Sequence, residues 1–211
     1  MKRLAPAITL LALLGLAGIC LAAPPGYRLL EATVASVNGE VIFLSDVKRE
    51  ACFYRCGVVS GLPSTELPLA QARQKLIADV LVLQERKKLG MGTVDNAAID
   101  AMASDIGSGM KKCSSPCATA ISGEEVRDLA ARRLMLREFL EKSVAVFIVI
   151  NEEEVRREMA LRSRAGHPDV ELSEEKVRRE LFADEAANEI RNWFSRVTSK
   201  SRIVLSPMEE Q

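Results

Sequence analysis

The residues whose type and spacing could carry chemistry are two pairs of cysteines, each with three residues between its members. The pairs are Cys52 with Cys56, and Cys113 with Cys117. In an exported chain, an even number of cysteines at matching spacing predicts disulfides. On a helix, Cys52 and Cys56 share one face a turn apart, so each is better placed to reach another segment than its neighbour. Of the three possible pairings, the nested one, Cys52 with Cys117 and Cys56 with Cys113, is the natural choice for two antiparallel segments.

Zinc is the alternative for these cysteines, because four thiolates in two close pairs can also hold a structural metal ion. Zinc pairs are usually separated by two residues, however, and an oxidising compartment favours disulfides. A redox-active site is less favoured again, since a CxxC motif near a βαβ pattern is the expected signature. We therefore predict a structural role for the cysteines, without a metal or another cofactor.

No other motif predicts catalysis. His167 is the single histidine of the chain and lies between Gly166 and Pro168, where a solvated loop is expected. Neither a serine nucleophile elbow, a glycine-rich phosphate loop nor a histidine-rich metal motif is present in the sequence. These residues therefore predict no catalytic site.

Residues 1–22 have the pattern of a secretory signal peptide. Lys2 and Arg3 form the positive start, an apolar run follows, and small residues end the segment. We expect cleavage after Ala22 and export of the remainder. An uncleaved anchor is the alternative, but the apolar run is shorter than the roughly 20 residues of a membrane span. Lipidation of Cys20 is the minor alternative.

The balance of charges argues against binding of nucleic acid through a basic surface. The chain has 29 basic and 29 acidic residues, and removal of the leader takes away two positive charges. A nucleic-acid-binding surface would require a basic excess or stripe. The remaining residues, 23–211, have the length of one domain, and their many Leu, Val, Ala, Arg and Glu residues suit amphipathic helices.

The segment 33–47 predicts a β-hairpin that leads into the first helix. Asn38 and Gly39 are the residue pair that a two-residue type I′ turn prefers. Ser45 is expected to cap the helix that follows. Because an isolated hairpin is marginal in water, it requires a third strand. Residues 202–205 have the composition of a strand and are the candidate.

Helical periodicity accounts for most of the remaining chain. Pro116 is expected in the first turn of a new helix. The expected helices are 69–89, 93–106, 122–146, 151–165 and 173–197. Residues 107–109 are expected to close the second of them, residues 147–150 form a β-like run, and the last helix is expected to have a break or sharp kink at 182–184. The predicted fold class is mainly α with a small antiparallel sheet formed by the N-terminal hairpin and a C-terminal strand.

The order of these motifs resembles that of a known family. The hairpin VASVNGEVIFLSDV and the helix ARQKLIADVLVLQERKKLGM resemble the N-terminal chaperone module of the SurA, PrsA, PpiD and trigger-factor group. The ending KVRRELFADEAANEIRNWFSRVTSKSRIVL resembles the helix and strand that return to that module. The resemblance implies one domain over 23–211, with the hairpin and helices in 32–146, a connecting helix at 151–165, and a returning helix and strand in 173–205.

The departure from the family lies between residues 147 and 172. Members of the SurA type usually carry a parvulin prolyl isomerase domain between the N-terminal and final helices. The interval here is about 26 residues, which is too short for a domain of the usual 50 or more. The cysteine pairs also depart from the family pattern. We therefore expect the isomerase domain, and its activity, to be missing.

The resemblance implies an ATP-independent periplasmic chaperone. Its partners would be unfolded clients, outer-membrane proteins among them, held in an apolar groove, and not nucleic acid or small molecules. The candidate client-binding residues are Met102, Met135, Phe139 and Met159, although core packing is the simpler explanation for most of them. The alternatives are a dedicated assembly partner in the cell envelope and a residual isomerase-related protein. The sequence leaves the oligomeric state open.

Overall fold

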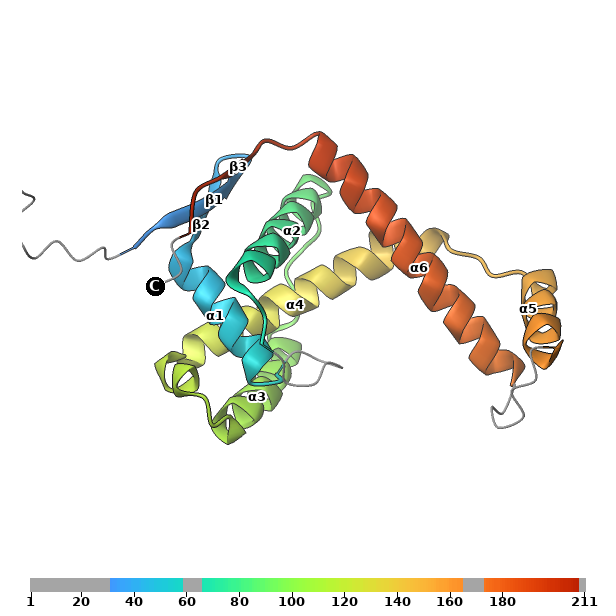
Figure 1. The fold of residues 1–211 in the computed structure, drawn as a ribbon, viewed down its shortest axis with the longest axis horizontal. Helices are drawn as coiled ribbons and strands as arrows, with labels where there is room; N and C mark the ends of the chain where they lie inside the picture. Colours follow the sequence, from blue (N-terminus) through green and yellow to red (C-terminus); the bar gives the residue numbers. More distant parts are fainter. Residues whose placement is uncertain (1–30, 59–65, 165–172, 209–211) are drawn as a thin grey trace, which may run out of the picture. The chain divides into compact units, whose positions relative to one another are not determined.

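The fold is mainly helical with one small antiparallel sheet, as predicted. The computed structural model describes residues 31–58, 66–164 and 173–208 (Figure 1). The elements of these residues are β1 (Thr33–Val37), β2 (Glu40–Phe43), α1 (Leu44–Arg55), α2 (Leu69–Lys88), α3 (Asn96–Lys112), a 3₁₀ turn (Pro116–Ala120), α4 (Gly123–Ser143), a second 3₁₀ turn (Ala145–Phe147), α5 (Glu152–Arg164), α6 (Glu174–Ser199) and β3 (Ile203–Leu205). The predicted signal peptide and His167 lie outside the described residues. Within the described ranges, no helix has the length and apolar character that crossing a membrane requires.

The sheet joins the two ends of the described chain. β1 lies in the centre, with β2 and β3 antiparallel on its two sides (Figure 1). Asn38 and Gly39 have φ angles of 52° and 92°, as a type I′ turn requires. The pairing of Val37 with Ile203 and of Ala35 with Leu205 confirms that the C-terminal strand completes the hairpin.

Helix α1 begins one residue after the hairpin, and the prediction that Ser45 caps it is wrong. β2 continues into α1 without a linker, so Ser45 already lies in the first turn and Phe43 takes the cap position. The carboxylate of Asp46 accepts a hydrogen bond from the backbone N–H of Phe43 at 3.0 Å. This bond satisfies a backbone donor that the helix cannot pair itself.

One hydrophobic core lies between the sheet, α1 and α2. Val34, Val37 and Val47 are fully buried and pack with Leu76 and Leu81. A second cluster joins α1 to α3 and α4, and a third joins α2, α4 and α6. Because α2 contributes to the first and third clusters, it is the element around which the sheet and the last helix are organised.

Helix α3 continues through residues 107–109, where the sequence predicts an end. Burial of Ile106 and Met110 stabilises the last turn. Gly109 lies where α3 approaches Val58 closely: a Cβ atom at Gly109 would lie 2.6 Å from Cγ1 of Val58, so a larger residue would force the Val58 side chain to shift. The glycine therefore allows close packing and does not end the helix.

Helix α6 is continuous and Figure 1 shows no sharp bend in it, so the predicted break or sharp kink at 182–184 is also wrong. The apolar stripe changes direction because the two halves of α6 pack against different elements. The N-terminal half contacts α5 and buries Val177. In the C-terminal half, Trp193 and Phe194 pack on the cluster that contains Phe139. A change of packing partner produces the same sequence signal as a break.

The capping boxes of two helices are confirmed. Ser122 and Glu125 exchange backbone and side-chain hydrogen bonds at the start of α4. Asn151 and Glu154 do the same at the start of α5. The predicted β-like run at 147–150 is not a strand; it belongs to the segment between α4 and α5, residues 144–151, which we call the connector.

Candidate functional site

The cysteines form the two nested disulfides that the sequence predicts. Cys52 is bonded to Cys117 and Cys56 to Cys113, with Cα–Cα distances of 6.0 and 5.2 Å. They fasten α1 to the segment that follows α3. Sulfur atoms of Cys52, Cys56 and Cys117 lie within 4.8 Å of one another, but in the disulfide form they are bonded in pairs and are not metal ligands. Two disulfides are compatible with an oxidising, extracytoplasmic compartment.

A buried cluster of charged side chains joins α1, α2 and α4. The side chain of Glu50 has no exposed surface, and its two carboxylate oxygens lie 3.0 Å from Nζ of Lys75 and 2.8 Å from the guanidinium of Arg132. Asp79 lies 2.8 Å from the same Lys75. Polar residues that interrupt an apolar helical stripe, as Asp79 does beside Ile77, are the sequence signal that could have indicated this cluster. Its location between three packed helices makes it a structural element of the core.

The pKa values of Asp79 and Lys75 are both raised in this cluster, but by different causes. Burial raises the pKa of Asp79, which outweighs the attraction of Lys75 and Arg132. Burial opposes the charge of Lys75 as well, but this side chain is more exposed and faces two carboxylates, and their charges raise its pKa. The fold therefore makes Asp79 easier to protonate than a solvent-exposed aspartate and stabilises the charge of Lys75.

This pKa of Asp79 predicts a pH-dependent stability difference from an Asp79→Asn variant. A carboxyl whose folded-state pKa is raised contributes stability that is complete below its ordinary pKa of 3.8 and is lost as the pH rises through the folded-state value. The stability of the wild type relative to Asp79→Asn should fall as the pH is raised from 3 toward 7. Denaturant unfolding of both proteins at each pH measures the difference. A difference that stays constant, or grows with pH, would contradict this assignment.

The connector carries the most exposed large apolar side chains of the described residues. Val146, Phe147 and Val149 are 59%, 80% and 83% exposed. The three lie within four consecutive residues, whereas single exposed apolar residues elsewhere are ordinary. A concentration of this kind marks an interaction surface in many soluble proteins.

A groove of about 560 Å³ lies between the connector and α6. Its connector side is apolar and its α6 side contains Leu181. The carboxylates at the groove belong to Glu154, Asp184, Glu185 and Glu189, and no Lys or Arg lines it. The groove therefore combines an apolar wall with negative charge. We call it the connector groove.

The connector also has backbone groups without hydrogen-bond partners in the described chain. Ile148 closes the 3₁₀ turn with a hydrogen bond to Ala145. Among the hydrogen bonds of the described chain, none involves the backbone of Val149 or Ile150. These N–H and C=O groups, which have no partner in the described chain, could pair with an added strand.

The client-binding residues that the sequence suggests do not gather at one site. Met102 lines a groove of about 640 Å³ between α3 and the end of α1. Met135 on α4 and Met159 on α5 are half-buried. Phe139 is 1% exposed and its ring centroid lies 5.1 Å from that of Trp193, so it cannot serve as a client contact. Packing on another element, the simpler explanation, accounts for Phe139.

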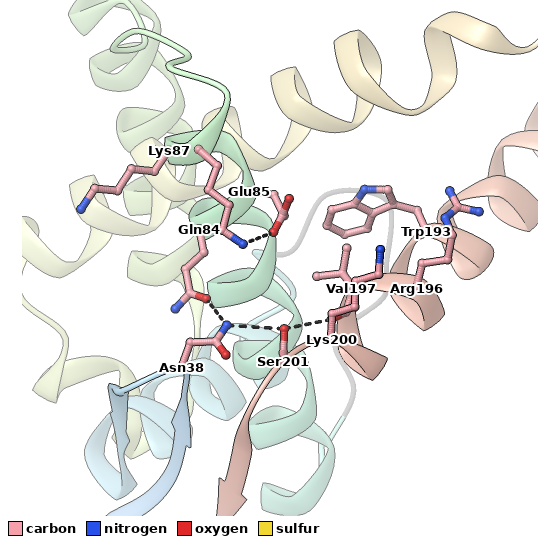
Figure 2. Close-up of a pocket in the computed structure, with 10 residues that line it drawn as sticks. Asn38, Gln84, Glu85, Lys87, Trp193, Arg196, Val197, Lys200 and Ser201 are labelled. Carbon is pink, nitrogen blue, oxygen red and sulfur yellow. Dashed lines mark hydrogen bonds and ion pairs between the residues drawn. The ribbon is translucent and has the colours of Figure 1, made fainter.

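A third groove, of about 760 Å³, lies between α2 and α6 beside the hairpin turn (Figure 2). Its cationic residues are Lys87, Lys88, Arg196 and Lys200, and Glu85 is its one carboxylate. Figure 2 shows the indole of Trp193 extending from α6 toward α2. We call this the basic groove.

Comparison of the chain with protein-family models and with curated proteins finds no match.

Proposed function

We propose that the protein is an ATP-independent chaperone that holds unfolded polypeptides at the connector groove. The observation that carries this proposal is the exposure of Val146, Phe147 and Val149 within four consecutive residues of the connector. Burial of client side chains against them would contribute about 25 cal/mol per Å² before the cost of ordering the client. Binding of this kind is weak and broad, as a holding function requires.

The connector offers a client two kinds of contact. Its apolar side chains bind aliphatic or aromatic residues of many sequences. The unpaired backbone groups of Val149 and Ile150 add hydrogen bonds that do not depend on the client sequence. Together they bind extended, unfolded chains and exclude folded proteins, whose backbone groups are already paired.

The negative charge of the connector groove predicts which client segments bind best. Asp184 and Glu185 take part in none of the ion pairs found among the described residues. An apolar client segment that also carries Lys or Arg should therefore bind better than one that carries Asp or Glu.

The resemblance to the SurA group supports the proposal and suggests the setting. The hairpin, the helices and the returning strand have the order of that group, and the segment where its members carry an isomerase is here the connector and α5. We place the protein in the periplasm, with outer-membrane proteins among its clients and without isomerase activity. The disulfides are compatible with that compartment.

Serine at two connector positions is expected to remove most of the holding activity. The Phe147→Ser/Val149→Ser variant loses two side chains that are 80% and 83% exposed, so its stability should change by less than about 0.5 kcal/mol. Aggregation of an unfolded outer-membrane protein, followed by light scattering after dilution from urea, measures the activity. We expect the wild type to suppress scattering and the variant to lose at least half of that suppression.

The matched control removes two exposed apolar residues elsewhere. Leu89→Ser/Leu161→Ser makes the same kind of change at the end of α2 and on α5, and should retain full suppression. Equal loss in both variants would show that general surface hydrophobicity is responsible and not the connector. If the wild type itself fails to suppress aggregation and instead binds one partner stoichiometrically, the protein is a dedicated assembly factor and the chaperone proposal is wrong.

A further inference from the structure

The basic groove has two cations without a counter-charge. Lys88 pairs with Glu85 at 2.6 Å, and Arg196 pairs with Glu189 at 2.9 Å. Lys87 and Lys200 enter no ion pair among the described residues. The groove is therefore positively charged, in contrast to the negative connector groove farther along the same helix.

The polar side chains of the basic groove already form hydrogen bonds within the protein. The side-chain amide of Asn38 donates to Gln84 at 2.7 Å, and its carbonyl accepts from the backbone N–H of Arg202 at 2.8 Å. Gln84 donates to the carbonyl of Val37, and Ser201 to that of Val197. These bonds hold the hairpin turn, α2 and the end of α6 together (Figure 2). Recognition of a ligand must come from the cations and from the apolar wall.

The apolar wall is formed by Trp193 and Val197 of α6. Trp193 is half-buried: one part of the ring packs on Phe139 and Phe194, while the rest lines the groove. Lys200 lies on α6 with Trp193, whereas Figure 2 shows Lys87 extending from α2 away from the indole. An indole in a groove with these cations suits an apolar side chain that is flanked by carboxylates. A purely anionic ligand would leave the indole unused, and a purely apolar one would leave the two cations unpaired.

We propose that the basic groove is a second polypeptide subsite, which binds extended segments with an aliphatic or aromatic residue next to Asp or Glu. This inference rests on the proposed chaperone function and specifies its selectivity. The two grooves lie along α6 and select opposite charges, with the Arg196–Glu189 ion pair between them. An unfolded chain of mixed charge can then be held at two places, which raises its overall affinity without a strong contact at either.

The test uses Trp193 as a reporter, because it is the only tryptophan of the chain. Three short peptides share a Phe-Leu-Phe core and carry Asp, Ser or Lys on both sides. Each is titrated into the intact, oxidised protein while the fluorescence of Trp193 is recorded. We expect the Asp peptide to change the emission and to bind about tenfold more tightly than the Ser peptide, from two screened charge contacts, with weakening by salt. The Lys peptide should give no saturable change.

Two double variants test whether the preference for the Asp peptide arises at the basic groove. Lys87→Gln/Lys200→Gln should remove the preference for the Asp peptide, whereas Lys111→Gln/Lys112→Gln, which changes two exposed lysines of α3, should preserve it. Equal affinity for all three peptides, or an Asp preference that survives in Lys87→Gln/Lys200→Gln, would overturn the inference. Trp193 reports on the basic groove and the aggregation assay reports on the connector. Absence of a peptide response with intact aggregation suppression therefore refutes this subsite alone, and absence of both refutes the proposed function.

Discussion

Removal of both disulfides is expected to lower the free energy of unfolding by about 6–7 kcal/mol, whereas removal of either one alone should cost only about 2.5 kcal/mol. The reason is that the bonds are nested. Cys52–Cys117 and Cys56–Cys113 span 65 and 57 residues, so either one closes nearly the same long loop in the unfolded chain. When one is present, the other closes a further loop of only about eight residues, the sum of the two short spacings.

Alanine variants test this difference directly. Cys52→Ala/Cys117→Ala, Cys56→Ala/Cys113→Ala and the fourfold variant are compared with the wild type by urea unfolding. The fourfold loss should exceed the sum of the two single losses by about 1–2 kcal/mol, because the long-loop term is lost only in the fourfold variant. Additive losses would show that the bonds stabilise the protein independently, and would contradict the nested account.

Glu50→Ala is expected to cost about 3 kcal/mol, the lower end of the range for breaking a buried ion pair. The variant would remove the buried carboxylate of α1 that pairs with both Lys75 and Arg132. The lower end applies because Lys75 and Arg132 are about a quarter exposed, and water can partly replace the lost partner.

The control for Glu50 is an acidic residue in an exposed ion pair. Glu66→Ala removes the partner of Arg55, and both side chains are largely exposed, so a change below about 0.5 kcal/mol is expected. Thermal unfolding followed by circular dichroism measures both variants. If Glu50→Ala melts with the wild type, or if Glu66→Ala loses as much, the charged cluster does not hold the three helices together.

Much of the fold could be predicted from local signals. Asn38 and Gly39 specify the turn, Ser122 and Glu125 specify the start of α4, and the nested cysteine pairing follows from two segments that approach each other. The return of Ile203–Leu205 to β1 could be predicted because a hairpin of that size requires a third strand. These features depend on residues close in sequence or on a simple requirement of the sheet.

The remaining features depend on which element covers which side chain. Periodicity indicates that Phe139 is apolar but not that Trp193 covers it, and it cannot separate a break in α6 from a change of packing partner. Gly109 has the sequence signal of a helix end, yet its role is close packing against Val58. The run at 147–150 has strand composition, but no strand of the described residues lies beside it.

The connector was not predicted as the candidate site, because the sequence does not show which side chains are left uncovered. Its apolar residues have the composition of a core segment, and their exposure depends on the absence of a covering element among the described residues. Methionines are candidates because of their residue type, but the most exposed large apolar side chains of the described residues are Phe147 and Val149.

The central claim is that unfolded clients bind at the connector, and site-specific crosslinking tests it most directly. A photoreactive phenylalanine analogue is placed at Phe147, where it preserves the aromatic side chain, and in a second protein at Leu161, an exposed apolar position on α5. Each protein is irradiated with an outer-membrane protein in its unfolded and in its folded form. We expect a strong crosslink from position 147 to the unfolded client, little to the folded client, and little from position 161. Equal crosslinking from both positions, or none from position 147, would contradict the account.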